Sequence, residues 1–182
     1  SKESKESLID VVRRAKKGDS QAFSELYDLY LTPIYRFIYI SARDRDEAED
    51  LTQAVFIKAW AALPNYQNEG RPFSAWLYRI AKNLLIDVSR KKRMVSLEDM
   101  SPTEEPHDDT NDPHQMLDQK EEMRTAFTAF KELTDEQRQV LTLRFLEEQS
   151  HKEIAEIMDK NEATVRQMQH RALEALRKIL KS

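Results

Sequence analysis

The chain has 182 residues, of which 34% are charged and 40% hydrophobic, and its formal net charge is −4. It has no cysteine, which excludes disulfides, cysteine-ligated zinc and cysteine nucleophiles. Its two glycines are too few for a glycine-rich phosphate-binding loop. No apolar run has the length of a membrane span, and none follows the polar start as in a secretion signal, so we expect a cytoplasmic protein without membrane insertion.

The first half of the chain predicts four helices. Apolar spacings of three and four indicate a helix over residues 8–17 that ends at Gly18, and a second from about residue 20 that Pro33 kinks or splits. A third helix is expected over residues 44–63 and a fourth from Pro72, where a proline fits the first turn. Residues 96–118 hold three prolines, no aromatic residue, and eight acidic residues with no lysine or arginine, which is typical of a flexible linker.

Four more helices are expected over residues 119–133, 134–146, 150–158 and 162–181. Thr134 with Gln137, and Ser150 with Glu153, have the spacing of capping boxes. The second of these helices carries the apolar residues Val140, Leu141, Leu143 and Leu146. The sequence therefore predicts an all-α fold with two small helical domains, over residues 1–95 and 119–182, joined by a flexible acidic linker over residues 96–118.

The distribution of charge is more informative than its total. Residues 71–93 contain seven basic residues and one acidic residue, and residues 160–181 contain six basic and two acidic ones. Between them, residues 96–122 contain ten acidic residues and one lysine. Two basic helical segments are thus separated by an acidic one, and both basic segments are candidates for contact with nucleic acid.

Residues 150–158, a three-residue turn and residues 162–181 have the lengths of a helix-turn-helix. Val165, Met168, Ala172, Leu176 and Ile179 form one apolar face of the second helix. Polar residues lie on the other face, as in a recognition helix: Thr164, Arg166, Gln167, His170, Arg171 and Glu174. The alternative is an ordinary two-helix hairpin with a solvated charged face.

Residues 50–60 (DLTQAVFIKAW) and 73–87 (FSAWLYRIAKNLLID) resemble region 2 of bacterial extracytoplasmic-function (ECF) sigma factors of the sigma-70 family. Residues 134–181, with LTLRF at 141–145 and HRA at 170–172, resemble their region 4. The resemblance implies a non-enzymatic RNA polymerase sigma factor without cofactor or metal. Its expected partners are core RNA polymerase (the β′ clamp helices and the β flap), promoter DNA with −10 and −35 elements, and an anti-sigma factor.

The resemblance also implies roles for individual residues. The polymerase-docking stretch matches Asp50, Leu51, Gln53 and Phe56. The loop that captures an unstacked −10 base matches Asn65, Tyr66, Gln67, Asn68 and Glu69. The helix along the −10 DNA matches Arg79, Lys82, Asn83, Asp87, Arg90 and Lys91. The −35 readers match Arg166, Gln167, His170 and Arg171, and Thr164 lies on the same face.

Several interpretations stay open. Arg90–Arg93 are either a solvated helix end or phosphate contacts, and Trp76 is expected in the core, whereas Tyr78 fits either core or site. The linker is either a simple tether or, as in the family, a strand that enters the polymerase cleft; it also has the charge to shield the basic helices. Common family members have a serine–arginine pair where this chain has Gln167 and Met168, which puts one DNA contact in doubt.

Two other function classes compete with a sigma factor. A stand-alone helix-turn-helix regulator would bind duplex DNA without polymerase, usually as a dimer. An enzyme is disfavoured because the four histidines are scattered without metal-ligand spacing and no carboxylate pair is marked for acid–base chemistry.

Overall fold

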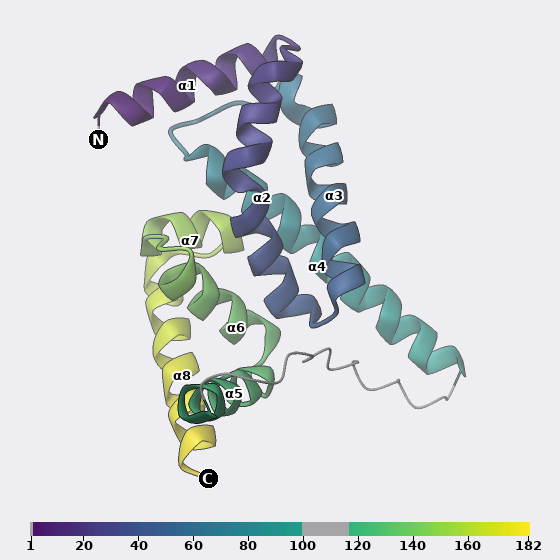
Figure 1. Cartoon of the computed structure of the whole chain (residues 1–182), viewed down its shortest axis with the longest axis vertical. Coiled ribbons are helices and arrows are strands. Elements are labelled where there is room, and N and C mark those ends of the chain that lie inside the picture. The colour runs from purple at the N-terminus through teal and green to yellow at the C-terminus, as the bar shows by residue number, and fades with distance from the viewer. Residues whose placement is uncertain (1, 100–116) are drawn as a thin grey trace. The chain divides into compact units, whose positions relative to one another are not determined.

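The computed structural model describes residues 2–99 and 117–182, with side chains for residues 7–98 and 124–182. Within these ranges every regular element is helical (Figure 1). The helices fall into an N-terminal and a C-terminal compact unit, each with its own core.

The N-terminal unit consists of α1 (Lys2–Lys16), α2 (Ser20–Ala42), α3 (Arg45–Ala62), the short 3-10 helix η1 (Leu63–Asn65) and α4 (Phe73–Asp99). The first helix thus begins six residues earlier than its apolar spacing predicts. α2 runs without interruption through Pro33, so the predicted alternative of a split helix is wrong.

Short polar residues and one glycine set the ends of these helices. Gly18 has a φ of +91°, as predicted for the residue that closes α1, because glycine has no Cβ to clash in this conformation. Asp19 then caps α2 by accepting from the amides of Gln21 and Ala22 at 3.0 and 3.2 Å. Asp44 caps α3 in the same way, accepting from the Glu47 amide at 2.8 Å.

The core of the N-terminal unit lies between α2, α3 and α4, which pack on one another, while α1 packs on α2 and η1. Its central side chains are fully buried: Leu26, Ile34, Phe37, Ile38, Val55, Leu63 and Leu77. Aromatic pairs join the helices. Tyr27 of α2 meets Phe56 of α3 edge-on at 4.7 Å between ring centroids, and Phe37 meets Tyr78 of α4 at 5.4 Å. Tyr78 is therefore a core residue.

The C-terminal unit contains α5 (Leu117–Lys131), α6 (Asp135–Leu141), the π-turn η2 (Thr142–Leu146), most of α7 (His151–Met158) and α8 (Glu162–Lys181). Both predicted capping boxes are confirmed, with Thr134 ahead of α6 and Ser150 ahead of α7. α8 has the predicted bounds. In its core, Leu133, Leu141 and Ala172 form a buried cluster that fixes α8 against α5 and α6.

Two features depart from the sequence pattern. The π-turn shifts the register after Leu141, so Phe145 and Leu146 are 56% and 49% exposed although Leu143 is fully buried. α4 continues to Asp99, four residues into the predicted linker, and α5 begins at Leu117, two residues earlier than predicted. Residues 100–116 of the predicted linker lie outside the described residues. Among the helices that are described, none combines the length and apolarity needed to cross a bilayer.

Candidate nucleic-acid interface

One surface of α3 is formed by residues that follow each other at helical spacing. Asp50, Gln53 and Ile57 are exposed and separated by three and four residues, so they lie on one side of the helix. Ile57 is 69% exposed, and the sequence prediction did not include it in the docking set. Its position outside the buried apolar stripe of α3 could have indicated that it is exposed. Leu51 and Phe56, from the same predicted docking set, are buried and support this surface from below.

The loop between η1 and α4 has a buried end and an exposed tip. Tyr66 is only 7% exposed, and its ring packs on Phe73 and Trp76 with centroids 5.5 and 4.7 Å away. Burial raises the pKa of the Tyr66 hydroxyl and keeps it neutral. The other predicted loop residues are exposed: Asn65, Gln67, Asn68 and Glu69. The loop thus presents amide and carboxylate groups at its tip, while its tyrosine faces the aromatic cluster.

The loop closes through backbone geometry. Glu69 and Gly70 have φ values of +44° and +75°, and the Arg71 amide donates to the Asn68 carbonyl at 2.7 Å. Only glycine adopts this conformation without steric cost, which explains one of the two glycines of the chain.

The basic face of α4 is partly neutralised by ion pairs within the unit. Arg90 pairs with Asp87 at 2.7 Å, and Lys92 reaches Glu47 of α3 at 2.8 Å. Lys91 is exposed, as are Arg90 and Asn83, whereas Arg79 and Lys82 are half-buried. The exposure of the predicted −10 residues therefore rises along α4, from the half-buried Arg79 and Lys82 to the exposed Arg90 and Lys91.

The second helix-turn-helix element, α8, has the two faces that the sequence predicts. Val165 and Ala172 are fully buried, and Met168, Leu176 and Ile179 are half-buried beside them. The exposed positions are those predicted to face DNA: Arg166, Gln167, His170 and Arg171. Asn161 caps the helix by accepting from the Thr164 amide at 2.8 Å, so Thr164 lies in the first turn and is half-buried.

A hydrogen bond joins the two helices of this motif. His151 Nε2, at the start of α7, lies 2.7 Å from Gln169 Oε1 on α8. Gln169 is half-buried, and this contact directs its side chain to the neighbouring helix. No sequence signal distinguished Gln169 from the other polar residues of α8.

In the ranges with described side chains, no group of three or more histidine, aspartate or glutamate side chains is arranged to hold a metal ion. What the described surfaces offer chemically is charge, amides and several exposed aliphatic side chains, of which Ile57 lies in the predicted docking stretch. These groups suit recognition of polyanions and of another protein surface.

The comparisons with known proteins match these two units separately. Residues 26–94 match the family model of sigma-70 region 2, and residues 129–178 match that of sigma-70 region 4. The chain is 34% identical over 178 residues to the ECF RNA polymerase sigma factor SigW of Bacillus subtilis, covering 93% of this chain and 95% of that protein. It is 32% identical over 176 residues to BldN of Streptomyces coelicolor, covering 95% of this chain and 66% of that protein.

Solved structures share the fold. The sigma factor RpoE of Bartonella quintana, in complex with the anti-sigma factor NepR, has a TM-score of 0.75 at 24% identity and covers 87% of this chain and 96% of its own. CnrH, in complex with the cytosolic domain of CnrY, has a TM-score of 0.71 at 22% identity and covers 94% and 95%.

A stand-alone helix-turn-helix regulator would account for the C-terminal match alone. Matches to both regions, in order and with relatives over nearly the full chain, favour the sigma factor. The chain therefore belongs to the ECF sigma factors of the sigma-70 family, whose members serve RNA polymerase in the initiation of transcription.

Proposed function

We propose that this chain binds core RNA polymerase in the cytoplasm, directs it to promoters through −35 and −10 elements, and helps to separate the DNA strands, without catalysis or a cofactor of its own. The observation that carries the proposal is that regions 2 and 4 occur together on a chain whose relative SigW, of matching length, is an ECF RNA polymerase sigma factor.

Docking on the polymerase is assigned to the surface of α3 formed by Asp50, Gln53 and Ile57. Ile57 is 69% exposed and Trp60, one turn later on α3, is 39% exposed, and neighbouring exposed apolar side chains bordered by polar ones mark protein-binding surfaces. Asp50→Arg reverses a charge on this surface and should abolish binding to core polymerase. Asp28→Arg, an exposed charge reversal on α2, is the matched control. Equal core affinity for both variants would refute the assignment.

Strand separation is assigned to the loop tip and α4. Opening DNA loses base stacking, and a protein without an ATP-driven step recovers that energy by holding an extruded base. The exposed tip offers Asn65, Gln67, Asn68 and Glu69 for contact with base edges. Because Tyr66 is buried in the aromatic cluster, we assign it to support of the tip. We assign contact with the DNA backbone to Arg90 and Lys91, which are exposed on α4.

The −35 element is assigned to α8. Arg166, Gln167, His170 and Arg171 are exposed on the face opposite the buried Val165 and Ala172. Arginine donates two hydrogen bonds to guanine in the major groove, and glutamine can bridge adenine.

A protein that masks the polymerase-binding surface is a further expected partner. The related RpoE structure contains the anti-sigma factor NepR. We propose a partner of the same kind for this chain, which competes with core polymerase for the α3 surface.

The decisive experiment is run-off transcription with core polymerase on a promoter library, combined with footprinting of the chain alone. A sigma factor should give new start sites only together with core polymerase and should footprint weakly by itself. A strong footprint without polymerase, with no change in start sites, would refute the proposed function.

A further inference from the structure

The loop that carries the proposed base-capturing tip begins at a residue that α1 contacts. Tyr66 follows η1 directly, and α1 packs on η1. The Lys16 ammonium, in the last turn of α1, lies 5.9 Å from the centroid of the Tyr66 ring. This distance is at the limit of about 6 Å for an attraction between a cation and an aromatic face.

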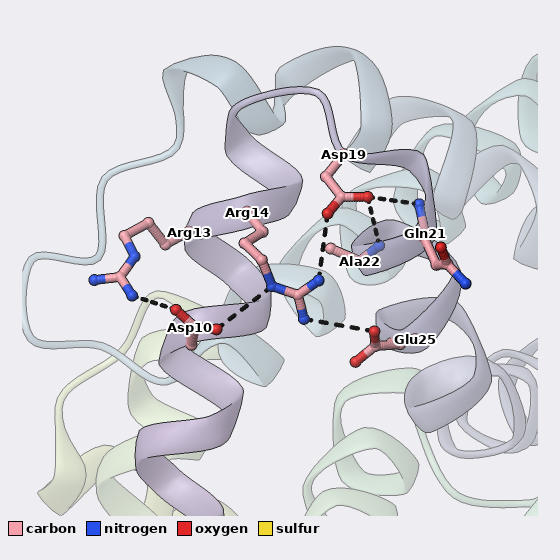
Figure 2. A network of polar contacts seen from close by, with 7 residues as sticks. All are labelled: Asp10, Arg13, Arg14, Asp19, Gln21, Ala22 and Glu25. Atoms are coloured by element: carbon pink, nitrogen blue, oxygen red, sulfur yellow. Dashed lines mark hydrogen bonds and ion pairs between the residues drawn. The ribbon is translucent and has the colours of Figure 1, made fainter.

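Besides its packing on α2, α1 is joined to the start of α2 by the ion pairs of one arginine (Figure 2). The Arg14 guanidinium lies 3.4 Å from Asp10 of its own helix, 3.3 Å from the cap residue Asp19 and 3.5 Å from Glu25 of α2. Arg13, the preceding residue, pairs with Asp10 within α1 and points to the other side of that helix in Figure 2. Arg14 therefore connects two helices, whereas the ion pair of Arg13 lies within α1.

The Tyr66 ring also contacts the beginning of α4. Phe73 is the first residue of α4 and meets the Tyr66 ring nearly perpendicularly, at 88° between the ring planes. Trp76, one turn later, lies closer, at 4.7 Å. Both ends of the loop, at Tyr66 and at Phe73, thus meet in one aromatic cluster, and Lys16 covers that cluster from α1.

We propose that α1 positions the base-capturing loop, with Lys16 as a positioning residue that acts through Tyr66 and Arg14 as the residue that fixes α1. The inference rests on the proposed function, because it assigns α1 to the step in which the loop holds an extruded base. Neither residue contacts DNA in this role. A preformed loop lowers the entropy lost on capture, so loss of α1 contacts weakens promoter opening more than it weakens binding of polymerase or of the −35 element.

The test uses the full chain with core polymerase and a promoter from the library experiment, with 2-aminopurine at successive −10 positions to report unstacking. Lys16→Met keeps the aliphatic stem and removes the charge, and we expect the opening equilibrium to fall about two- to five-fold. Lys17→Met is the matched control, since Lys17 is the exposed neighbour of equal charge. Lys16→Arg keeps a cation and should restore opening.

A second pair of variants, Arg14→Met and its control Arg13→Met, tests whether the position of the whole helix α1 affects promoter opening. Arg14→Met should reduce opening at least as much as Lys16→Met, and Arg13→Met should stay near wild type. All variants should retain wild-type affinity for core polymerase. Equal losses in Lys16→Met and Lys17→Met would overturn the proposal and indicate general charge attraction to DNA. Failure of Lys16→Arg to keep wild-type opening would overturn it as well, because a cation over the Tyr66 ring would then not be sufficient.

A second measurement does not depend on polymerase. A glutamate-specific protease cuts an exposed loop after Glu69, and the rate rises when the loop loses its support. Lys16→Met and Arg14→Met should accelerate this cut, which is identified by the mass of the fragments. The control variants Lys17→Met and Arg13→Met should not. If wild-type protein opens no promoter, the proposed function fails, but this measurement still decides whether α1 holds the loop. Unchanged cleavage in both variants would refute the inference.

Discussion

Arg138 offers a quantitative test of how the C-terminal unit is held together. Its side chain is only 4% exposed, and Nη1 donates to the carbonyls of Lys131 and Leu133 at 2.9 and 2.7 Å. These carbonyls lie at and just beyond the end of α5, where a helix leaves its acceptors unsatisfied. Nη2 also pairs with Asp135. Arg138 therefore closes the connection between α5 and α6.

Arg138→Met preserves most of the buried stem but removes the donors. A hydrogen bond from a charged group contributes about 1.5–3 kcal/mol, and two such bonds are lost, so we expect the free energy of unfolding of this unit to fall by about 3–6 kcal/mol. Small domains are stable by about 5 kcal/mol, so the variant should be close to unfolding without denaturant. Arg177→Met, an exposed arginine on α8, is the control.

The assay can separate the two units without dissecting the chain. Both tryptophans and all six tyrosines precede residue 79, so intrinsic fluorescence reports the N-terminal unit alone. Far-UV circular dichroism reports both units. In urea, Arg138→Met should leave the fluorescence transition in place and move the remaining dichroism change to lower concentration. A dichroism transition within about 0.5 kcal/mol of wild type would refute the reasoning, because it would show that these buried bonds contribute nothing net.

Three further predictions concern the cap of α2 and the helix-turn-helix. The hydrogen bond from the Ala22 amide is the largest cause that lowers the pKa of the Asp19 carboxyl. The carboxylate therefore contributes its full stability above its unfolded pKa of about 4, and this contribution is lost as the pH falls below that value. Asp19→Asn should make the melting temperature followed by fluorescence less dependent on pH in acid, and an unchanged pH dependence would contradict this. Gln169→Ala removes the hydrogen bond to His151 and should weaken −35 DNA binding about three- to ten-fold. The double variant Gln169→Ala with His151→Ala should bind no more weakly than Gln169→Ala alone. Additive losses in this double-mutant cycle would show that the two side chains act independently. Arg171→Ala should weaken binding to −35 DNA. If Arg171 contacts phosphate, the loss of affinity should be similar for all DNA sequences, and the slope of log affinity against log salt concentration should be shallower by about 1. A loss that depends on the base at one position would instead indicate that Arg171 reads that base.

Capping chemistry explains why the C-terminal helices were predictable. Thr134 with Gln137 and Ser150 with Glu153 fix two helix starts through contacts over three residues, which a sequence displays directly. The bounds of α8 followed from its uninterrupted apolar periodicity. The polar face of α8 was predicted with it, because one periodicity sets both faces.

The errors arose where long-range packing outweighs local pattern. Pro33 lacks an amide proton, but α2 continues through it because its buried face, with Ile34 and Phe37, packs on α3 and α4. Tyr66 lies in a polar stretch that reads as an exposed loop, and only the aromatic pair Phe73 and Trp76 explains its burial. The π-turn at Thr142–Leu146 leaves no mark in a 3.6-residue periodicity, so the exposure of Leu146 could not be anticipated.

The left-handed residue between η2 and α7 has a practical consequence. Glu148 has a φ of +52°, a conformation that is costly for most residues with a Cβ but less so for asparagine, while the Gln149 amide still donates to the Leu143 carbonyl at 2.9 Å. Because this turn needs the backbone shape and not the carboxylate, glycine or asparagine at position 148 should raise the melting temperature of the C-terminal unit. Because the chain has only two glycines, turns with a left-handed residue other than glycine are positions at which a substitution can raise its thermal stability.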